Sequence, residues 1–183
     1  RKYFRWVEYS ISSSVMIVLI AQVTGVAEIS AIISDKQSQV LERARKYDIT
    51  NFYLPLAKDR SDWDRKLLDL VNKLKPDLVV SAGFMRILSP EFVSRFDCIN
   101  SHPSLLPAFP GAHAVRDALA AGVTETGCTV HWIDAGIDTG PIIGQIPMPI
   151  YPTDSEETLH ARIKIAERAL IVETVSALLA DKH

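Results

Sequence analysis

Apolar and polar residues alternate along the chain with two different periodicities. Short runs rich in Val, Ile and Leu are typical of buried strands, and apolar residues three and four positions apart are typical of amphipathic helices. The clearest predicted strands are residues 26–33 and 77–82. Weaker strands are predicted at residues 49–54 and 98–99, a further strand at 127–133, and an extended segment at 142–150.

Amphipathic helices are predicted between these segments. Ser61 is a candidate N-cap of a helix that ends before Pro76, and Gly122 ends a later helix. The four predicted helices span residues 38–47, 61–74, 112–121 and 156–180. Such alternation of strands and helices predicts a single three-layer α/β domain, with a mainly parallel, twisted sheet and helices on both faces. Ligands of such a sheet bind beyond the carboxyl ends of its strands.

Composition narrows the class of protein. The 183 residues are 48% hydrophobic, which supplies a core without disulfides, and 20 Lys and Arg against 22 Asp and Glu give a formal charge of −2. No basic field favours nucleic acid as a partner. Two cysteines cannot build a disulfide framework, so we expect a reduced, cytoplasmic protein. The longest apolar run, residues 15–23, is shorter than the roughly 20 residues of a membrane span, so we expect no membrane partner.

Two loops carry candidate chemistry. Asn100 and His102 stand two positions apart at the end of an extended segment, so their side chains point the same way, and three prolines then stiffen the backbone. Asp138 lies between two glycines in a later loop. That carboxylate either satisfies backbone donors in its own turn or orients the imidazole of His102. The residues alone leave these readings open, as they do the plainer one that Asn100 caps a turn and His102 is an ordinary loop residue.

Four stretches in order, residues 82–90, 100–111, 126–131 and 138–141, together resemble the folate-dependent formyltransferases, and the similarity runs from about residue 27 to 179. The match is best to the stand-alone enzymes of purine synthesis. The resemblance implies a Rossmann-like formyltransferase fold in one domain over residues 1–183. It also implies a nucleotide-binding half at about 1–98, and a folate-binding and catalytic half at about 99–183.

The resemblance further implies a reaction. The formyl group of 10-formyltetrahydrofolate, a co-substrate, would pass to the amine of glycinamide ribonucleotide in de novo purine biosynthesis, by direct attack through a tetrahedral intermediate. Asn100, His102 and Asp138 would be the catalytic residues. Both partners are small molecules, no metal is implied, and a homodimer is left open.

Binding residues follow from the same resemblance. The pterin pocket would be lined by Met85, Arg86, Ile87, Leu88, Ala135, Gly136 and Ile137. The ribonucleotide would meet Ser10, Ser12, Ser13, Ser14, Lys164 and Glu167. Thr129 and His131 would support the catalytic residues without touching substrate.

The phosphate-binding loop departs from the family pattern. The family has a glycine-rich loop here, whereas this chain has serines and Ile11, whose β-branched side chain disfavours positive φ. Serine hydroxyls, and a helix beginning near Ser14, would be the remaining phosphate donors. Two alternatives therefore stay open: a hydrolase of 10-formyltetrahydrofolate, and a non-catalytic folate-binding paralogue with a degraded phosphate loop.

Overall fold

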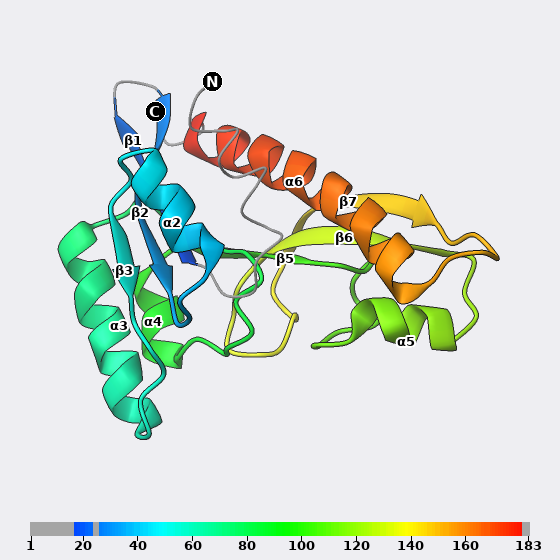
Figure 1. The fold of residues 1–183 in the computed structure, drawn as a ribbon, viewed down its shortest axis with the longest axis horizontal. Coiled ribbons are helices and arrows are strands. Elements are labelled where there is room, and N and C mark those ends of the chain that lie inside the picture. The colour runs from blue at the N-terminus through cyan, green and yellow to red at the C-terminus, as the bar shows by residue number, and fades with distance from the viewer. Residues whose placement is uncertain (1–16, 24–25, 181–183) are drawn as a thin grey trace.

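The computed structural model describes residues 17–23 and 26–180 (Figure 1). The predicted phosphate-binding serines, at positions 10 and 12–14, lie outside the described residues. The strands are β1 (Ile17–Val23), β2 (Val26–Ser34), β3 (Asn51–Tyr53), β4 (Leu78–Ser81), β5 (Cys98–His102), β6 (Glu125–Trp132) and β7 (Ile142–Pro149). The helices are α2 (Gln39–Lys46), α3 (Arg60–Leu74), α4 (Pro90–Arg95), α5 (Ala114–Ala120) and α6 (Glu156–Ala180).

The described strands form one sheet in the order β3-β2-β1-β4-β5-β6-β7. Only the β2–β3 and β4–β5 pairs are parallel, and the other neighbouring pairs are antiparallel. The α/β class is confirmed, but the sheet is mixed, so the prediction of mainly parallel pairing is wrong. Part of the reason is the short link between β1 and β2. Residues 24–25 are too few for a parallel crossover, which needs a dozen or more residues.

The chain around the first strand also differs from expectation. Residues 17–23 are a strand, so the prediction of a helix beginning near Ser14 is wrong from residue 17 onward. The sequence of β1 is a nearly continuous apolar run, which suits a strand in the middle of a sheet.

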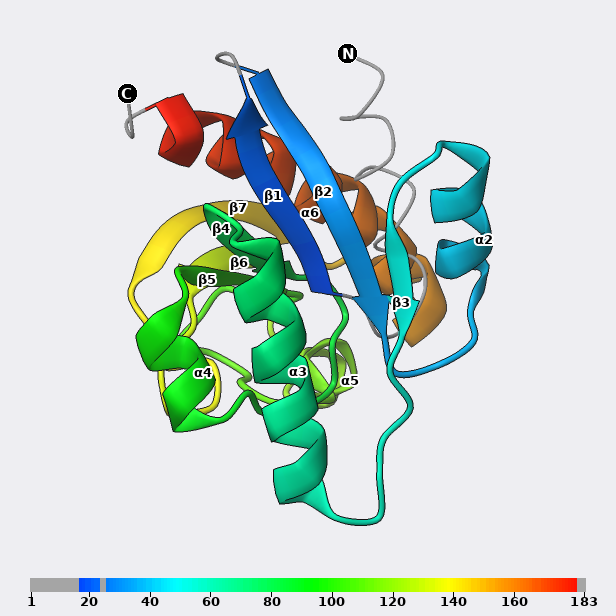
Figure 2. The ribbon, with the colours of Figure 1, turned by 90° about the vertical axis from the view of Figure 1, so that its left-hand side faces the viewer.

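Helices cover both faces of the sheet, as predicted. Figure 2 shows α3 and α4 in front of the strands and α6 behind them. Successive residues of β4 separate the two cores: Leu78 and Val80 pack with residues of α2 and α6, whereas Val79 packs with Trp63 and other residues of α3 and α4. This alternation is the period of two that a strand buried on both faces requires.

Two helix starts differ from the predictions. Asp59, not Ser61, caps α3, because the Asp59 carboxylate accepts the Ser61 N–H at 2.9 Å. Helix α4 was not predicted, although Ser89 followed by Pro90 is the usual signal for a capped helix with proline in its first turn. The Ser89 hydroxyl accepts from the Phe92 N–H at 3.2 Å.

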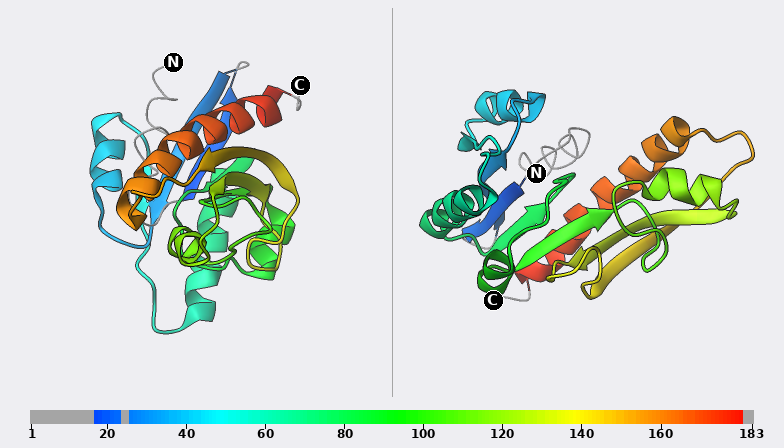
Figure 3. Two further views of the ribbon diagram at one scale, coloured as in Figure 1. Left: turned by 90° about the vertical axis from the view of Figure 1, so that its right-hand side faces the viewer. Right: turned by 90° about the horizontal axis from the view of Figure 1, so that it is seen from below.

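Strand β5 is longer than the two residues predicted and runs from Cys98 to His102. It is parallel to β4, so the carboxyl ends of both strands open on the same side. Figure 3 shows α6 running along β6 and β7, the last two strands at one edge of the sheet. The end of β5 therefore lies between the loop after β4 and the long C-terminal helix.

Candidate active site

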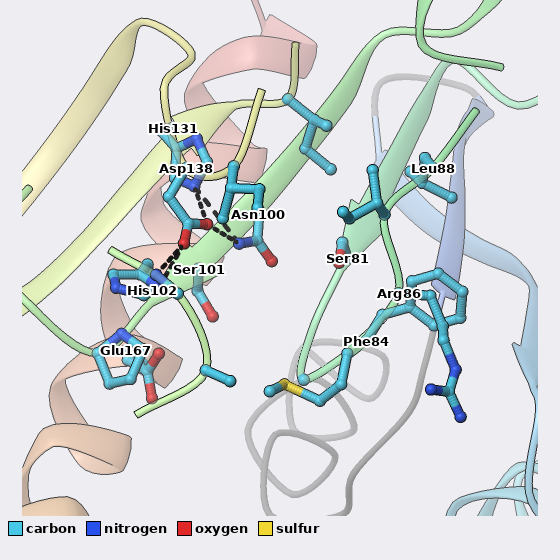
Figure 4. Close-up of a pocket in the computed structure, with 18 of the residues that line it drawn as sticks. Ser81, Phe84, Arg86, Leu88, Asn100, Ser101, His102, His131, Asp138 and Glu167 are labelled. Atoms are coloured by element: carbon cyan, nitrogen blue, oxygen red, sulfur yellow. Dashed lines mark hydrogen bonds and ion pairs between the residues drawn. The ribbon is translucent and has the colours of Figure 1, made fainter. Parts of the chain in front are cut away.

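A cavity of about 550 Å³ opens at the carboxyl ends of β4 and β5 (Figure 4). Its walls come from the end of β4, the loop at 83–88, β5, the loop at 133–138 and one side of α6. A volume of this size suits a small-molecule ligand. The predicted site residues on the walls are Met85, Arg86, Ile87, Leu88, Asn100, His102, His131, Gly136, Ile137, Asp138, Lys164 and Glu167.

Strands β5 and β6 together present four polar side chains to one face of the sheet. Asn100 pairs with His131, and His102 pairs with Thr129, in the antiparallel register of the two strands. Side chains of directly opposed residues share a face, and so do residues two apart. His102, His131 and Thr129 are buried. Thr129 and His131 were predicted to support the catalytic residues without touching substrate. His131 lines the cavity, and Thr129 does not.

The loop after β6 delivers Asp138 to the same place. Asp138 has φ of 55°, in the left-handed region that Asp and Asn tolerate better than most residues. Asp134 organises the loop: its carboxylate accepts the Gly136 N–H at 2.9 Å and the Thr139 hydroxyl at 2.8 Å. The Asp138 side chain in turn accepts the N–H of Gly111 at 2.8 Å, which ties the two candidate loops together.

Gly140 allows this loop to close against β6. A Cβ added at Gly140 would lie 1.8 Å from the carbonyl oxygen of Trp132. The same strand end donates the Trp132 N–H to the Pro141 carbonyl at 2.9 Å. Only glycine fits so close an approach of two backbones.

Asn100, His102 and Asp138, remote in sequence, converge (Figure 4). His102 Nδ1 lies 3.4 Å from Asp138 Oδ2, and Asn100 Nδ2 lies 3.5 Å from Asp138 Oδ1. His131 Nε2 lies 3.5 Å from the same Oδ1 and 3.4 Å from Asn100 Nδ2. The structure therefore brings an amide, two imidazoles and a carboxylate to one cavity wall.

The backbone carbonyl next to each imidazole shows which ring nitrogen carries a proton. His102 Nε2 lies 2.8 Å from the Phe109 carbonyl, and His131 Nδ1 lies 2.8 Å from the Trp132 carbonyl. A carbonyl only accepts, so each of these nitrogens carries hydrogen. His102 Nδ1 faces the Asp138 carboxylate. When both nitrogens are protonated, the ring donates to the Phe109 carbonyl and to Asp138. When the ring is neutral, Nδ1 instead turns a lone pair toward that carboxylate.

Asp138 is held in its ionised form. Burial alone raises the pKa of its carboxyl, but the hydrogen bonds from His131 and the Gly111 N–H, with positive charge on the two imidazoles, outweigh burial and lower the pKa. Asp138 is therefore a carboxylate at neutral pH.

Apolar side chains form part of the cavity wall. Met85, Ile87 and Ile137 are 55%, 57% and 56% exposed, and all three line the cavity. Leu88 also lines it but is buried. Ala135 is the one predicted pterin residue that does not line the cavity.

Arg86 reaches from this wall to a buried acid. Its Nε donates to Asp35 Oδ2 at 3.1 Å, and the Asp35 side chain is fully buried. The ion pair joins the loop after β4 to the end of β2, and it leaves the rest of the guanidinium beside the cavity.

Helix α6 supplies a third wall, on which Lys164 and Glu167 lie one turn apart. Glu167 is buried beside Ser101, whose hydroxyl donates to it. Burial raises the pKa of Glu167 to about 7, against the opposing effects of Ser101, Lys164 and Arg168. His160, one turn before Lys164, also lines the cavity, and burial and then the charge of Lys164 lower its pKa.

Several residues that shape this site were not predicted from the sequence: Phe109, Gly111, Asp134 and His160. The Asp134-x-Gly136 spacing is a turn signal that could have identified Asp134. The spacing of His160 and Lys164, four residues apart on a helix, could have identified His160. Phe109 and Gly111 act through backbone groups, so their side chains carry no signal.

Two further properties bear on the kind of protein. Among residues 17–23 and 26–180, no three or more His, Cys, Asp or Glu side chains are grouped in a way that could hold a metal ion. No helix in the described part of the chain is long and apolar enough to cross a bilayer.

Comparison with known proteins identifies the family. The formyl transferase family model matches residues 12–175. The chain is 51% identical over 156 residues to a phosphoribosylglycinamide formyltransferase of Mycobacterium tuberculosis, covering 83% of this chain and 73% of that protein. It is 42% identical over 153 residues to the phosphoribosylglycinamide formyltransferase of Escherichia coli, covering 81% and 72%.

A solved structure agrees. The phosphoribosylglycinamide formyltransferase of Bacillus halodurans superposes with a TM-score of 0.81 at 35% identity, covering 85% of this chain and 83% of that one. Fold and sequence thus point to the same group, and the resemblance noted in the motifs is confirmed. The chain is an enzyme of the formyl transferase family and belongs, within it, to the phosphoribosylglycinamide formyltransferases.

Proposed function

We propose that this enzyme transfers the formyl group of 10-formyltetrahydrofolate to the primary amine of glycinamide ribonucleotide, through Asn100, His102 and Asp138. The observation that carries the proposal is the convergence of these three side chains on one wall of the cavity. The names of the similar enzymes agree with this acceptor.

The first step is attack of the amine nitrogen on the formyl carbon. A new C–N bond forms, and the electron pair of the C=O bond moves to oxygen, giving a tetrahedral oxyanion. An amide NH₂ has two donors, so one hydrogen of Asn100 Nδ2 can face Asp138 while the other meets the oxyanion. One such donor contributes about 10²- to 10³-fold in rate.

The second step moves one proton. The attacking nitrogen becomes positively charged, and the Asp138 carboxylate, ionised at neutral pH, accepts its proton directly or through water. The electron pair on the oxyanion re-forms the C=O bond as the C–N10 bond breaks, and protonated His102 donates a proton to N10. The proton held by Asp138 then passes to His102 Nδ1, 3.4 Å away, so the net change is one proton moved from the amine to N10. Such general acid–base catalysis contributes about 10²- to 10⁴-fold. The products are the formylated amine and tetrahydrofolate, and no covalent enzyme intermediate is needed.

The two substrates suit different walls. Met85, Ile87 and Ile137 offer exposed apolar surface to the flat pterin ring, and backbone groups of the two adjoining loops can read its polar edge. Lys164 and Glu167 offer a cation and a carboxyl to the ribonucleotide from the α6 side. In this arrangement the formyl group lies between the two walls, next to Asn100.

The test is an assay of the purified protein with 10-formyltetrahydrofolate, with and without glycinamide ribonucleotide. Formylated ribonucleotide and tetrahydrofolate, formed only when the amine is present, are the expected result. Formate and tetrahydrofolate formed without the amine would indicate a hydrolase instead. Folate binding with no turnover would indicate the non-catalytic paralogue.

A further inference from the structure

His102, Thr129 and Gln145 form a row across three neighbouring strands. His102 of β5 pairs with Thr129 of β6, and Thr129 pairs with Gln145 of β7. Directly opposed residues of an antiparallel ladder point to the same face, so all three side chains lie on the face that carries the catalytic residues. Gln145 is exposed on β7, whereas Thr129 and His102 are buried.

The hydroxyl of Thr129 uses every hydrogen bond that it can make. It donates to the Ser104 carbonyl at 2.7 Å, and it accepts from the Leu106 N–H at 3.1 Å and from Gln145 Nε2 at 2.9 Å. A hydroxyl has one donor and two acceptor positions, so this group is saturated. All of its partners other than Gln145 belong to the proline-rich loop that follows His102.

Gln145 makes a second bond to the same loop. Its Nε2 donates to the Leu106 carbonyl at 2.9 Å as well as to Thr129. Gln145 and Thr129 therefore hold both the N–H and the C=O of Leu106. The loop contains Pro103, Pro107 and Pro110, which have no N–H, so side chains must supply anchors that the backbone lacks.

The anchored loop ends at the partner of His102. The Ser104 hydroxyl donates to the Ala108 carbonyl at 2.6 Å and lies 3.4 Å from the Phe109 carbonyl. That Phe109 carbonyl accepts from His102 Nε2 at 2.8 Å. The position of Phe109 sets the tilt of the imidazole, and so the aim of Nδ1 toward Asp138.

We propose that Gln145 is a positioning residue for His102, which acts through Thr129 and the loop at 103–110. The proposal rests on the proposed function of His102. Gln145 lies two strands away from the catalytic imidazole, on β7, and does not line the cavity. Its effect is on the geometry of proton transfer and not on substrate affinity.

The decisive variant is Gln145→Met, which keeps the length of the side chain and removes both donors. We expect only a small loss of thermal stability, because the position is exposed but the Leu106 carbonyl and the Thr129 hydroxyl each lose a donor. We expect kcat to fall about 10-fold, since small displacements of a catalytic group have effects of that order or larger. The KM values for both substrates should stay within about twofold, and the pH–rate profile should shift measurably from that of the wild type, because the hydrogen bond to the imidazole changes.

Two controls separate positioning from general structure. Ile142→Met, at an exposed position of the same strand, should match the wild type in all of these measurements. Thr129→Ser keeps the hydroxyl and Thr129→Val removes it, so any change in the profile should be smaller in the serine variant. In a Thr129→Val background, Gln145→Met should have a smaller further effect, since only its bond to the Leu106 carbonyl remains to be lost.

A spectroscopic readout keeps the proposal independent of turnover. The ring-nitrogen chemical shifts of His102 should differ between the wild type and Gln145→Met even if the wild type transfers no formyl group. Unchanged shifts with an unchanged pH profile would overturn the positioning role. A fall in kcat accompanied by lower stability and an unshifted profile would also overturn it, because that pattern is merely structural. Failure of the wild type to form product would instead overturn the proposed function.

Discussion

Asp138 and Glu167 line the same cavity, yet their surroundings move their pKa values in opposite directions. Asp138 receives hydrogen bonds from His131 and the Gly111 N–H, which outweigh its burial, whereas burial dominates at Glu167. Two carboxyls that titrate far apart can hold different roles at one pH. Asp138 is equipped to accept a proton, and Glu167 to be a neutral donor in part of the molecules near pH 7.

The catalytic assignment predicts the behaviour of two variants. Asp138→Asn keeps the shape of the side chain but cannot take a proton, and His102→Ala removes the imidazole. Each should lower formyl transfer at least about 10²-fold. Steady-state rates with both substrates are the measurement, and circular dichroism checks that the fold is kept. Asp117→Asn, on α5 at a partly exposed position that does not line the cavity, should turn over normally. Near-normal rates in either site variant would remove that residue from the mechanism.

The raised pKa of Glu167 should make the stability of the protein depend on pH. Its pKa is raised from 4.5 in the unfolded chain to about 7 in the fold, so the folded state binds the proton more tightly. The contribution to stability is complete below pH 4.5 and is lost as pH rises through 7. The free energy of unfolding of Glu167→Gln should equal that of the wild type near pH 4.5. At pH 8 it should be about 1–3 kcal/mol higher than that of the wild type, because the variant has no carboxylate to ionise in the buried site.

Urea unfolding of both proteins at several pH values makes this measurement. Glu157→Gln, at an exposed position of the same helix, corrects for the exchange of side chains itself. A difference between wild type and Glu167→Gln that is constant with pH would show that the buried carboxyl is not the cause.

At the scale of elements, local signals predicted helices better than strand pairing. The predicted start of α6, at Glu156, agrees with the structure, because a capping sequence and an acidic first turn are local signals. The direction of β1 was not predicted, because pairing depends on the length of its connection to β2 rather than on the strand itself. The same limit applies to the site. Asn100 and His102 follow from spacing along one strand, whereas His131 joins them only through the β5–β6 register.

The close packing of the loop between β6 and β7 against β6 leads to a prediction about stability and turnover. Gly140→Ala would place a Cβ against the Trp132 carbonyl, so the loop must shift and carry Asp138 with it. We expect a loss of about 1–3 kcal/mol in stability and a fall in kcat larger than that of Gly122→Ala. Gly122 has positive φ, but a Cβ there would meet open space. Thermal unfolding and turnover of the two variants give the comparison, and wild-type turnover of Gly140→Ala would show that the loop tolerates the shift.

At the scale of the whole molecule, one cavity is built from residues on both sides of the predicted boundary at about residue 98, from Ser81 to Glu167. The resemblance predicts a nucleotide-binding half at about 1–98 and a folate-binding half at about 99–183, and that division stays a prediction. The residues proposed for the two substrates do not follow it. Met85 and Ile87, proposed for the pterin, precede the boundary, and Lys164 and Glu167, proposed for the ribonucleotide, follow it. Spacing along the sequence could not reveal this mixed arrangement. It follows from the order of strands in the sheet, because β4 and β5 are neighbours and the loop after β4 therefore lies beside the end of β5.

Hydrogen exchange with each ligand alone tests this crossed arrangement. An unreactive folate analogue should slow amide exchange in two loops, at 83–88 and 133–138, since their backbones adjoin the proposed pterin wall. Glycinamide ribonucleotide should instead slow exchange in the part of α6 at 160–167. Each ligand at 100 times its dissociation constant should also stabilise the protein by about 2.7 kcal/mol, which confirms that it is bound during the experiment. Protection by the folate analogue that is confined to residues after 99 would contradict the proposed pterin wall, because Met85 and Ile87 would then lie outside the contact.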